Sequence, residues 1–490
     1  MKSPILLGLL LASFANAETK LSALFSDHLI LQQKQANPVW GWDDPGTEVT
    51  VEIAGQSHKT TAGEDGRWEV KLAEIPASAE PKEMKITGSS EAVVKDILVG
   101  EVWLCSGQSN MGWVLNDSFG QDLTKLAADL PQLRLMTMPK IGTQEPQKNF
   151  NGKWELSNAQ SAGNFSAVGY YFGKTLHEIL GVPVGLINNA WGGSAAEAWV
   201  PREVLEKDGR FDSYINAWKQ KEAQFEKGGL DAEATKKLKE ELSDQHRPGN
   251  LYAGTLYPAI GYGIRGTIWY QGETNAGRAY QYDDLMNLLI TTWRKEWGQG
   301  DFPFYFVQLA DFQDETPNPG ESQWAELREA QTNTLRQIPN TGQAVITDLG
   351  ASNDIHPREK RDVGERLLRW ALAKDYGYDI AYRSPEFREM EVKEGKGILS
   401  FDHTGGGLKT SDVSTVRGFT ICGVDGKWKN AEGKVIGGDR IEISSTEVPA
   451  PTAVRYAWAT NPVANIVTNE GLPLTSFRTD DFPQITEPKK

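Results

Sequence analysis

Residues 101–111 read Glu101-Val102-Trp103-Leu104-Cys105-Ser106-Gly107-Gln108-Ser109-Asn110-Met111. An apolar run that stops abruptly at small and polar residues is typical of a buried parallel strand ending in a loop. Ligands of open α/β sheets collect at the carboxyl ends of such strands. We therefore expect Ser109, just past this strand, either to cap a following helix or to present its hydroxyl as a nucleophile.

The segments downstream of this stretch alternate between strand-like and helix-like patterns. Short apolar runs are followed by longer segments whose apolar residues recur at helical spacing. Such alternation predicts an α/β fold, with a parallel sheet covered on both faces by helices. The expected strands after 101–105 are 184–188, 264–270, 304–309 and 343–349, and the expected helices are 166–180, 280–297, 323–336 and one ending near 375.

The first residues are expected to be a targeting segment rather than part of the fold. Lys2, an apolar core and the small-residue site Ala15-Asn16-Ala17 make residues 1–17 typical of a secretory signal peptide cleaved after Ala17. The protein is therefore predicted to be secreted or periplasmic. No other segment approaches the apolar length of a transmembrane helix, so no membrane span is expected.

Changes of pattern divide the rest of the chain into three domains. Short strands separated by turn signals predict an N-terminal β-sandwich domain at 18–95 and a C-terminal β-rich domain at 378–490. The α/β domain occupies 96–377 between them. It carries a charged helical insertion at 201–248, which is either a lid over the site or a solvated hairpin.

The composition argues against several classes of partner and cofactor. There are 66 acidic and 51 basic residues, a net charge of −15, which disfavours nucleic acid and anionic membranes as partners. Cys105 and Cys422 are too few for a disulfide-built fold, and we interpret both as small buried hydrophobic residues. The sequence has no zinc-ligand spacing, calcium loop or glycine-rich phosphate loop, so no metal or other cofactor is expected.

Four loops at one edge of the expected sheet carry residues suited to ester hydrolysis. Hydrolysis through a serine needs a base for the hydroxyl proton, a group that orients the base, and donors for the oxyanion. A Gly-Gly turn can bring a backbone N–H close because no Cβ blocks the approach. The candidates are Ser109 as nucleophile, His356 as base, Asp354 as its partner, and Gly192-Gly193 and Asn275 as oxyanion donors.

His356 is also favoured by elimination. Of six histidines, it alone falls in a strand-to-helix loop of the expected α/β domain. Asp354-Ile355-His356-Pro357 could instead be only a turn before a helix. The conjunction of four such loops on one sheet edge favours the catalytic interpretation.

The same loops carry motifs that resemble the sialate O-acetylesterase branch of the SGNH hydrolase superfamily. The resemblance spans nearly the whole chain after the signal peptide and implies a flavodoxin-like three-layer sandwich with flanking β domains. It also implies a carboxylic ester hydrolase that removes O-acetyl groups from carbohydrates without a metal, and the signal peptide predicts that this enzyme is exported. The motifs in these loops are Gly107-Gln108-Ser109-Asn110-Met111, Trp191-Gly192-Gly193-Ser194, Trp269-Tyr270-Gln271-Gly272-Glu273-Thr274-Asn275 and Asp354-Ile355-His356-Pro357. Two further stretches resemble the amino-terminal β domain of that branch, and they are Phe25-Ser26-Asp27-His28-Leu29-Ile30-Leu31-Gln32 and Pro38-Val39-Trp40-Gly41-Trp42.

The resemblance also implies residue roles. It makes Ser109 the nucleophile and His356 the base, with the N–H groups of Ser109 and Gly193 and the side chain of Asn275 as oxyanion donors. The wider superfamily places an aspartate three residues before the histidine, where this chain has Asn353. The sialate esterase branch resembles this chain in its shorter spacing, which assigns the orienting role to Asp354, with Asn353 or a backbone carbonyl as the alternative.

The substrate and some roles are left open by the sequence. The acetylated sugar could be a sialic acid, or a plant polysaccharide such as xylan or pectin, and a non-catalytic carbohydrate-binding protein on the same scaffold is a further alternative. A sialate carboxylate would need a cation such as Arg278 or Arg358. Gln108 and Gln271 either line the substrate pocket or brace the backbone. The oligomeric state is not readable from the sequence.

Overall fold

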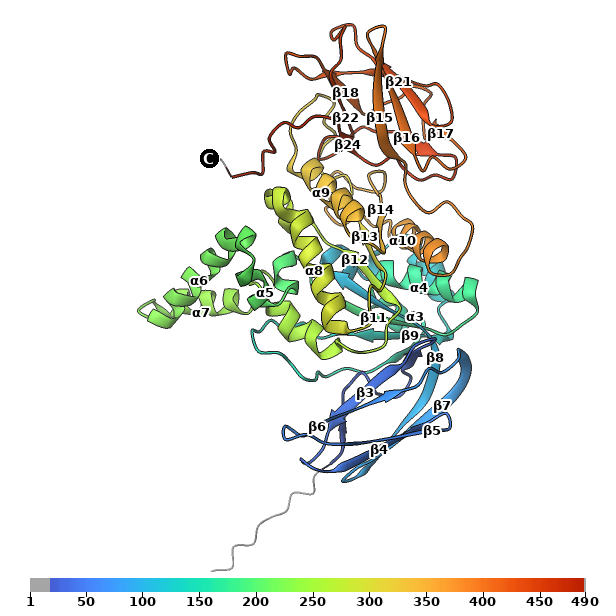
Figure 1. Cartoon of the computed structure of the whole chain (residues 1–490), viewed down its shortest axis with the longest axis vertical. Helices are drawn as coiled ribbons and strands as arrows, with labels where there is room; N and C mark the ends of the chain where they lie inside the picture. The colour runs from blue at the N-terminus through green and yellow to red at the C-terminus, as the bar shows by residue number, and fades with distance from the viewer. Residues whose placement is uncertain (1–17, 489–490) are drawn as a thin grey trace, which may run out of the picture.

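A computed structural model describes residues 18–488, so the expected signal peptide at 1–17 lies outside the described residues. At its centre is a sheet of parallel strands in the order β9–β11–β8–β12–β13–β14, with β10 antiparallel at the β9 edge (Figure 1). The predicted α/β class, with β-rich sheets on either side, is confirmed. The strands are β8 (Glu91–Gly107), β9 (Leu130–Thr137), β10 (Glu155–Ser157), β11 (Val184–Ala190), β12 (Gly266–Tyr270), β13 (Phe304–Val307) and β14 (Thr341–Ala344).

The strand β8 is 17 residues long and belongs to two sheets. Its first half pairs antiparallel with β7 (Ser78–Thr87) and parallel with β2 (Ile30–Gln32). Its second half pairs with β11 and β12 in the central sheet. The expected domain boundary between residues 95 and 96 therefore falls inside a continuous strand.

Glu101 lies at the middle of this strand and is fully buried. Its carboxylate accepts hydrogen bonds from Arg265, at 2.9 and 3.2 Å, on the segment leading into β12. It also accepts from the side chains of Gln32, at 3.0 Å, and Gln33, at 2.6 Å, in the N-terminal β region. One buried carboxylate thus ties the N-terminal strands to the α/β part.

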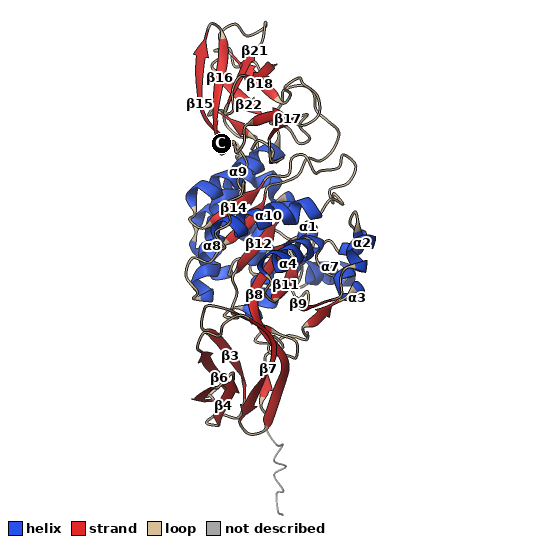
Figure 2. Cartoon of the chain, turned by 90° about the vertical axis from the view of Figure 1, so that its right-hand side faces the viewer, coloured by secondary structure: helices blue, strands red, loops and turns tan. Residues whose placement is uncertain are grey.

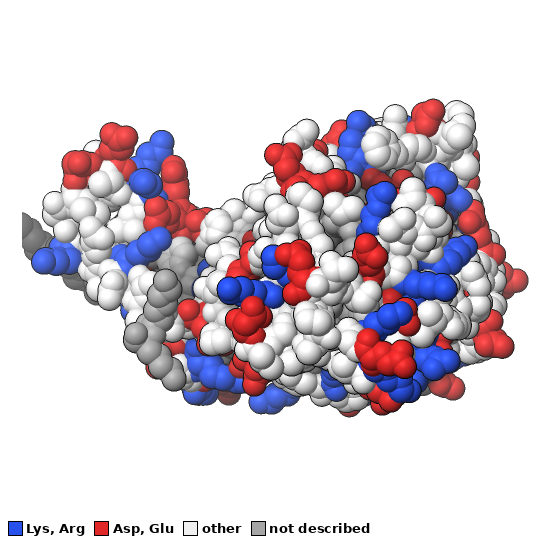
Figure 3. All heavy atoms as spheres, turned by 90° about the horizontal axis from the view of Figure 1, so that it is seen from above, with Lys and Arg blue, Asp and Glu red and all other residues white. Residues whose placement is uncertain are grey.

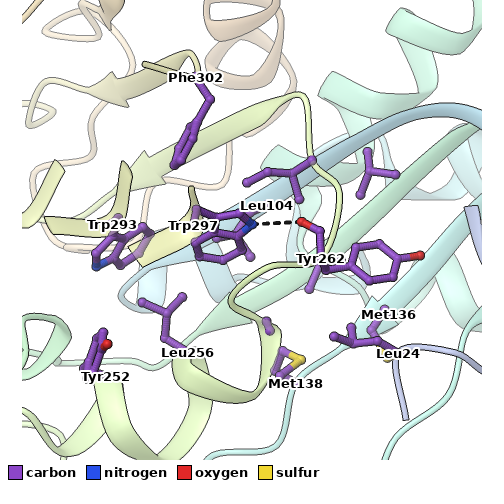
Figure 4. Packing of buried hydrophobic residues seen from close by; sticks show 14 of the residues in the cluster. Leu24, Leu104, Met136, Met138, Tyr252, Leu256, Tyr262, Trp293, Trp297 and Phe302 are labelled. Atoms are coloured by element: carbon purple, nitrogen blue, oxygen red, sulfur yellow. Dashed lines mark hydrogen bonds between the residues drawn. The ribbon is translucent and has the colours of Figure 1, made fainter. Parts of the chain in front are cut away.

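Helices cover both faces of the central sheet, as the alternation of patterns predicts (Figure 2). Successive residues of β8 point to opposite faces. Leu104 packs with α8 and α9, whereas Trp103 packs with α4 and α10. Figure 4 shows part of the first cluster, in which Trp297 Nε1 donates to the Tyr262 carbonyl at 2.8 Å. These helices are α4 (Ala167–Leu180), α8 (Tyr282–Trp297), α9 (Gln323–Gln337) and α10 (Arg361–Lys374), and two short ones are α2 (Gln121–Leu126) and α3 (Ala159–Gly163).

The last expected strand, 343–349, is shorter and earlier than predicted. β14 ends at Ala344, and a turn in which Leu349 N–H donates to Ile346 O follows it. Asp348 in this turn binds Arg366 of α10 through both carboxylate oxygens, at 2.5 and 2.6 Å. The apolar pattern of residues 343–349 does not reveal this ion pair, which joins residues 18 positions apart. The pattern alone therefore predicts a strand that is too long.

The insertion forms three α-helices and projects sideways from the α/β part in Figure 1. They are α5 (Arg202–Lys207), α6 (Asp212–Lys227) and α7 (Ala232–Leu242). Asp208 ends α5 and accepts from Arg210 N–H in the turn that separates α5 from α6. On the face seen in Figure 3, acidic and basic side chains are interspersed.

The terminal parts of the chain are β-rich. In the N-terminal part β1 (Lys20–Leu21), β3 (Asn37–Trp42) and β6 (Arg67–Leu72) form one sheet, and β4 (Glu48–Ile53), β5 (Gln56–Thr61) and β7 extend the other. The C-terminal strands are β15 (Glu386–Lys393), β16 (Lys396–Asp402), β17 (Leu408–Thr410), β18 (Phe419–Cys422), β19 (Lys429–Asn430), β20 (Glu432–Val435), β21 (Arg440–Ser444), β22 (Ala453–Tyr456), β23 (Ile466–Thr468) and β24 (Phe477–Arg478).

Both cysteines are buried and free, as expected for small hydrophobic residues. Among residues 18–488, no helix is long and apolar enough to span a membrane. The same residues include no group of three or more metal-ligating side chains placed to hold an ion.

Replacing Glu101 by glutamine tests the junction in β8. The variant leaves the buried part of Arg265 without a counter-charge, so we expect it to lower the free energy of unfolding by about 3 kcal/mol. Urea-induced unfolding, monitored by circular dichroism, measures the change in the free energy of unfolding. Glu91→Gln, at the exposed start of the same strand, is the matched control and should unfold like the wild type. Wild-type stability of Glu101→Gln would contradict the role of the junction.

Candidate active site

The candidate nucleophile, Ser109, lies at the start of α1 (Ser109–Gly112), two residues past the end of β8. Gly107 has φ +132°, and a Cβ there would lie 2.2 Å from the Tyr270 carbonyl oxygen, so only glycine fits this close passage beside β12. Gln108 is the N-cap residue of α1 and Ser109 is the first helical residue. Ser109 therefore does not cap the helix, and its hydroxyl is free for other contacts.

His356 faces that hydroxyl from the loop between β14 and α10. Its Nε2 lies 2.8 Å from Ser109 Oγ, although the two residues are 247 positions apart in the chain. The indole of Trp113, just after α1, stacks on the imidazole with ring centres 4.9 Å apart and planes at 16°. The structure thus brings the predicted nucleophile and base within hydrogen-bond distance, an arrangement that can remove the serine proton.

Asp354 lies beside His356 but holds the imidazole loosely. Its Oδ1 accepts from the backbone N–H of His356 at 2.8 Å and is 3.6 Å from the imidazole Nδ1, longer than a hydrogen bond. Asp354 is exposed, and so is Asn353 beside it. The carboxylate can still stabilise a positive imidazole by its charge.

The surroundings of His356 favour its neutral form. Burial lowers the pKa of His356, the carboxylate of Asp354 raises it, and the nearby ammonium of Lys360 lowers it, with a net shift downward. A base must be unprotonated to accept a proton. The lowered pKa therefore leaves His356 ready to act as a base at neutral pH.

The Gly-Gly turn follows β11 and lies against the serine. A Cβ on Gly192 would be 3.3 Å from Ser109 Cβ, so Gly192 is the glycine that contacts Ser109. Gly193 follows with φ +71°, and its carbonyl accepts from Thr274 Oγ1 at 3.1 Å. Within residues 18–488, the N–H groups of Ser109, Gly192 and Gly193 have no protein acceptor. They are available to an anionic oxygen at the site.

The side chain of Asn275 is buried and firmly oriented. Its Oδ1 accepts from the Ala196 N–H at 3.0 Å and from Gln271 Nε2 at 2.8 Å. Its Nδ2 donates to Glu197 Oε2 at 2.9 Å, and Glu197 is in turn paired with Arg278 at 2.9 Å. The second hydrogen of Nδ2 has no acceptor among the described residues, so it can serve a ligand.

The two glutamines predicted as pocket residues differ in their surroundings. Gln271 is fully buried, and its Nε2 donates to the Ser194 carbonyl at 3.0 Å as well as to Asn275. Its Oε1 accepts from Tyr282 at 2.7 Å. These contacts correspond to the bracing alternative for Gln271. Gln108 is also buried, but among residues 18–488 its Oε1 has no hydrogen-bond partner.

The insertion contacts the loops around the site at its base. Ala195, next to the Gly-Gly turn, donates its N–H to the carbonyl of Gln245 at 3.2 Å. The guanidinium of Arg278 lies 4.4 Å from the ring centre of Tyr214 on α6. The insertion therefore supports the loops of the site through Gln245 and the first turn of α6, while the rest of α6 and α7 project away (Figure 1).

Sequence reasoning missed a buried group of residues behind the serine. Lys360 Nζ donates to Asn110 Oδ1 at 2.6 Å, and Asn110 Nδ2 donates to Glu273 Oε1 at 2.6 Å. Asn110 and Glu273 belong to motifs already singled out, which was a usable signal. Lys360 had none, because a lysine at the start of a helix is usually exposed. Glu197 was missed because glutamates are also usually exposed, whereas this one is fully buried.

Comparison with known proteins gives consistent results. Residues 247–372 match the family model of the sialic acid-specific acetylesterase domain of carbohydrate esterases. The chain is 27% identical to mouse sialate O-acetylesterase over 491 residues and 26% identical to the human enzyme over 483, covering 90% of this chain and 90% and 88% of those proteins. A carbohydrate acetylesterase structure from Xanthomonas citri is 37% identical with a TM-score of 0.83, covering 95% of this chain and all of that one.

Covalent labelling tests the pairing of Ser109 with His356. We expect a fluorophosphonate to form an adduct on Ser109 and His356→Ala to slow labelling about 100-fold, because the base is removed. Peptide mass spectrometry locates the adduct. Ser352→Ala, which changes an exposed serine in the His356 loop, should label normally. An adduct that persists in Ser109→Ala would contradict the assignment.

Proposed function

Because the chain belongs to the carbohydrate esterase family that includes the sialate O-acetylesterases, we propose that it removes O-acetyl groups from carbohydrates through Ser109. The protein is a carboxylic ester hydrolase of acetylated carbohydrates. The observation that carries the assignment to Ser109 is the 2.8 Å contact between its Oγ and His356 Nε2. A protein that only binds carbohydrate has no need of a base beside a serine.

The reaction proceeds through an acetyl-serine intermediate. His356 takes the proton from Ser109 Oγ as that oxygen attacks the acetyl carbonyl, and then gives it to the departing sugar oxygen. Water, deprotonated by His356, releases acetate and restores the serine. Asp354, whose Oδ1 is 3.6 Å from Nδ1, stabilises the imidazolium formed in both steps.

Three donors are assigned to the oxyanion. They are the N–H groups of Ser109 and Gly193 and the second Nδ2 hydrogen of Asn275. All three lack acceptors among the described residues, which supports this role. Donors held in place before the reaction stabilise the developing charge without reorganising.

The α/β part is assigned to the flavodoxin-like SGNH hydrolases. Taken in chain order, β8, β11, β12, β13 and β14 lie in the spatial order 2-1-3-4-5, with β9 added outside β11. This is the order of flavodoxin-like sheets. Ser109 and Asn275 follow β8 and β12, the strands on either side of the switch in connection, where ligands of such sheets bind.

The domain and export assignments follow the sequence patterns. The catalytic domain spans 96–377 with the insertion 201–248, between β-rich domains at 18–95 and 378–490. The separate core of the C-terminal strands supports the boundary near 378, whereas the N-terminal strands share one core with a face of the central sheet. A signal peptide at 1–17 directs the protein out of the cytoplasm, to the periplasm or the exterior.

Sialate is the first candidate among acetylated sugars, because the curated relatives named above are sialate O-acetylesterases. Its carboxylate needs a free cation. Arg278 is committed to Glu197. Arg358 is exposed; among residues 18–488 its guanidinium donates one hydrogen bond, from Nε to the Asp117 carbonyl at 2.7 Å, and lies 5.2 Å from the Phe119 ring centre. Arg358 is thus the cation assigned to a sugar carboxylate.

A panel of acetylated sialic acids, xylans and pectins tests the function directly. We expect the wild type to release acetate and Ser109→Ala to keep less than about 1% of the rate, since the nucleophile is lost. Arg358→Met should raise KM for acetylated sialic acid but not for neutral xylan, because only the former carries a carboxylate. Acetate is measured by a coupled enzymatic assay. No release from any member, or an active Ser109→Ala, would refute the proposal.

Replacing Asn275 by alanine tests the oxyanion donors. Loss of one such donor costs about 3 kcal/mol of transition-state stabilisation, so we expect kcat to fall ~100-fold. Steady-state kinetics on 4-nitrophenyl acetate give the value. Asn353→Ala, at the exposed asparagine before Asp354, should leave kcat unchanged. A smaller effect at Asn275 than at Asn353 would remove Asn275 from this role.

A further inference from the structure

Resting on the proposed function, we infer that Lys360, acting through the side-chain amide of Asn110, is a positioning residue that holds His356 against Ser109. Neither residue touches the acetyl group in this assignment. Both lie behind the reacting pair and are buried, each 1% exposed.

The amide of Asn110 is fully used and can point only one way. Its Oδ1 accepts from Lys360 Nζ at 2.6 Å, and its Nδ2 donates to Glu273 Oε1 at 2.6 Å and to the Ile355 carbonyl at 3.0 Å. An ammonium can only donate and a carboxylate can only accept. The opposite charges on its two sides therefore fix the amide, which cannot rotate to exchange its oxygen and nitrogen.

This fixed amide connects the two halves of the catalytic pair. Asn110 is the residue after Ser109, and the Ile355 carbonyl belongs to the peptide bond that leads into His356. The hydrogen bond between them sets the separation of the serine helix and the histidine loop. It also supplies the restraint that Asp354 provides only weakly, because Asp354 is exposed and 3.6 Å from the imidazole Nδ1.

Lys360 has no carboxylate partner within ion-pair distance among the described residues. Its ammonium bonds Asn110 and lies 5.9 and 5.5 Å from the ring centres of Trp113 and Tyr270. Burying a cation in this way is costly. Burial lowers the pKa of Lys360 to about 7, although the charge of Glu273 opposes the shift. Because burying the charge of Lys360 is costly for the fold, its position is better explained by a role at the site.

The charge of Lys360 also acts on His356. Among the charged groups around the imidazole, Asp354 favours its protonated form, whereas Lys360 disfavours it. Glu273 lies on the far side of Asn110, and burial raises the pKa of Glu273. The acidic limb of activity should therefore lie below about pH 6.5, and activity should be lost as the pH falls through the lowered pKa of His356.

The test compares Lys360→Met with Lys374→Met, which changes an exposed lysine at the end of the same helix. Both are assayed on 4-nitrophenyl acetate across pH 4–9. We expect Lys360→Met to lower kcat about 10-fold or more with little change in KM, because the loop is misplaced. Its acidic limb should move to higher pH, whereas Asp354→Asn should move the limb to lower pH. Lys360→Arg, which keeps the charge, should keep the wild-type limb.

Asn110→Asp provides a second arm that does not depend on Lys360. It keeps the shape of the side chain but cannot donate to the Ile355 carbonyl, so the same loss of kcat is expected. Wild-type kcat in Lys360→Met or in Asn110→Asp overturns the inference. It is also overturned if Lys360→Met loses kcat while the acidic limb of its pH profile stays in place, or if Lys374→Met loses as much kcat as Lys360→Met. If the wild type is active and Ser109→Ala is not, these outcomes refute the inference alone, whereas an inactive wild type refutes the proposed function with it.

Discussion

The arrangement of the molecule depends on the hydrogen bonds that the buried carboxylate of Glu101 accepts. This carboxylate joins Gln32 and Gln33 of the N-terminal strands to Arg265 of the α/β part, at the point where β8 passes from one sheet to the other. From there the strand runs straight to Gly107, where its passage beside Tyr270 requires a glycine. The position of Ser109 therefore follows from a strand anchored in two sheets rather than from a flexible loop.

Two buried asparagines around the site are oriented in the same way, because the side-chain amide of each lies between a carboxylate and further polar groups. Asn275 is held by Glu197, which Arg278 neutralises, and Asn110 is held by Glu273 and Lys360. An amide offers both donor and acceptor atoms, so ionised neighbours can fix its orientation without placing charge on the reacting atoms. These amides also connect loops from distant parts of the chain, because Asn110 donates to the Ile355 carbonyl and Asn275 accepts from the Ala196 N–H.

Much of this could be predicted from local patterns. The α/β class followed from alternating strand and helix signals, and the loops after β8, β11 and β12 stood out because each places polar residues after an apolar run. Long-range contacts had no such signal. The Asp348–Arg366 pair that accompanies the early end of β14 and the burial of Lys360 depend on residues far away in the sequence or on the opposite side of a loop. The cap at Gln108 rather than Ser109 shows that a one-residue shift is also beyond pattern reasoning.

The continuity of β8 has a consequence for how the protein folds. Its two halves pair with strands as far apart in the sequence as β2 and β12, so neither sheet can close until contacts of long sequence separation have formed. Separate domains usually melt independently, each protected by its own core. Here the N-terminal strands and the central sheet share a backbone segment and should open together as one cooperative unit in hydrogen exchange. Ser109, two residues past the end of that segment, should therefore keep its position until the whole unit opens.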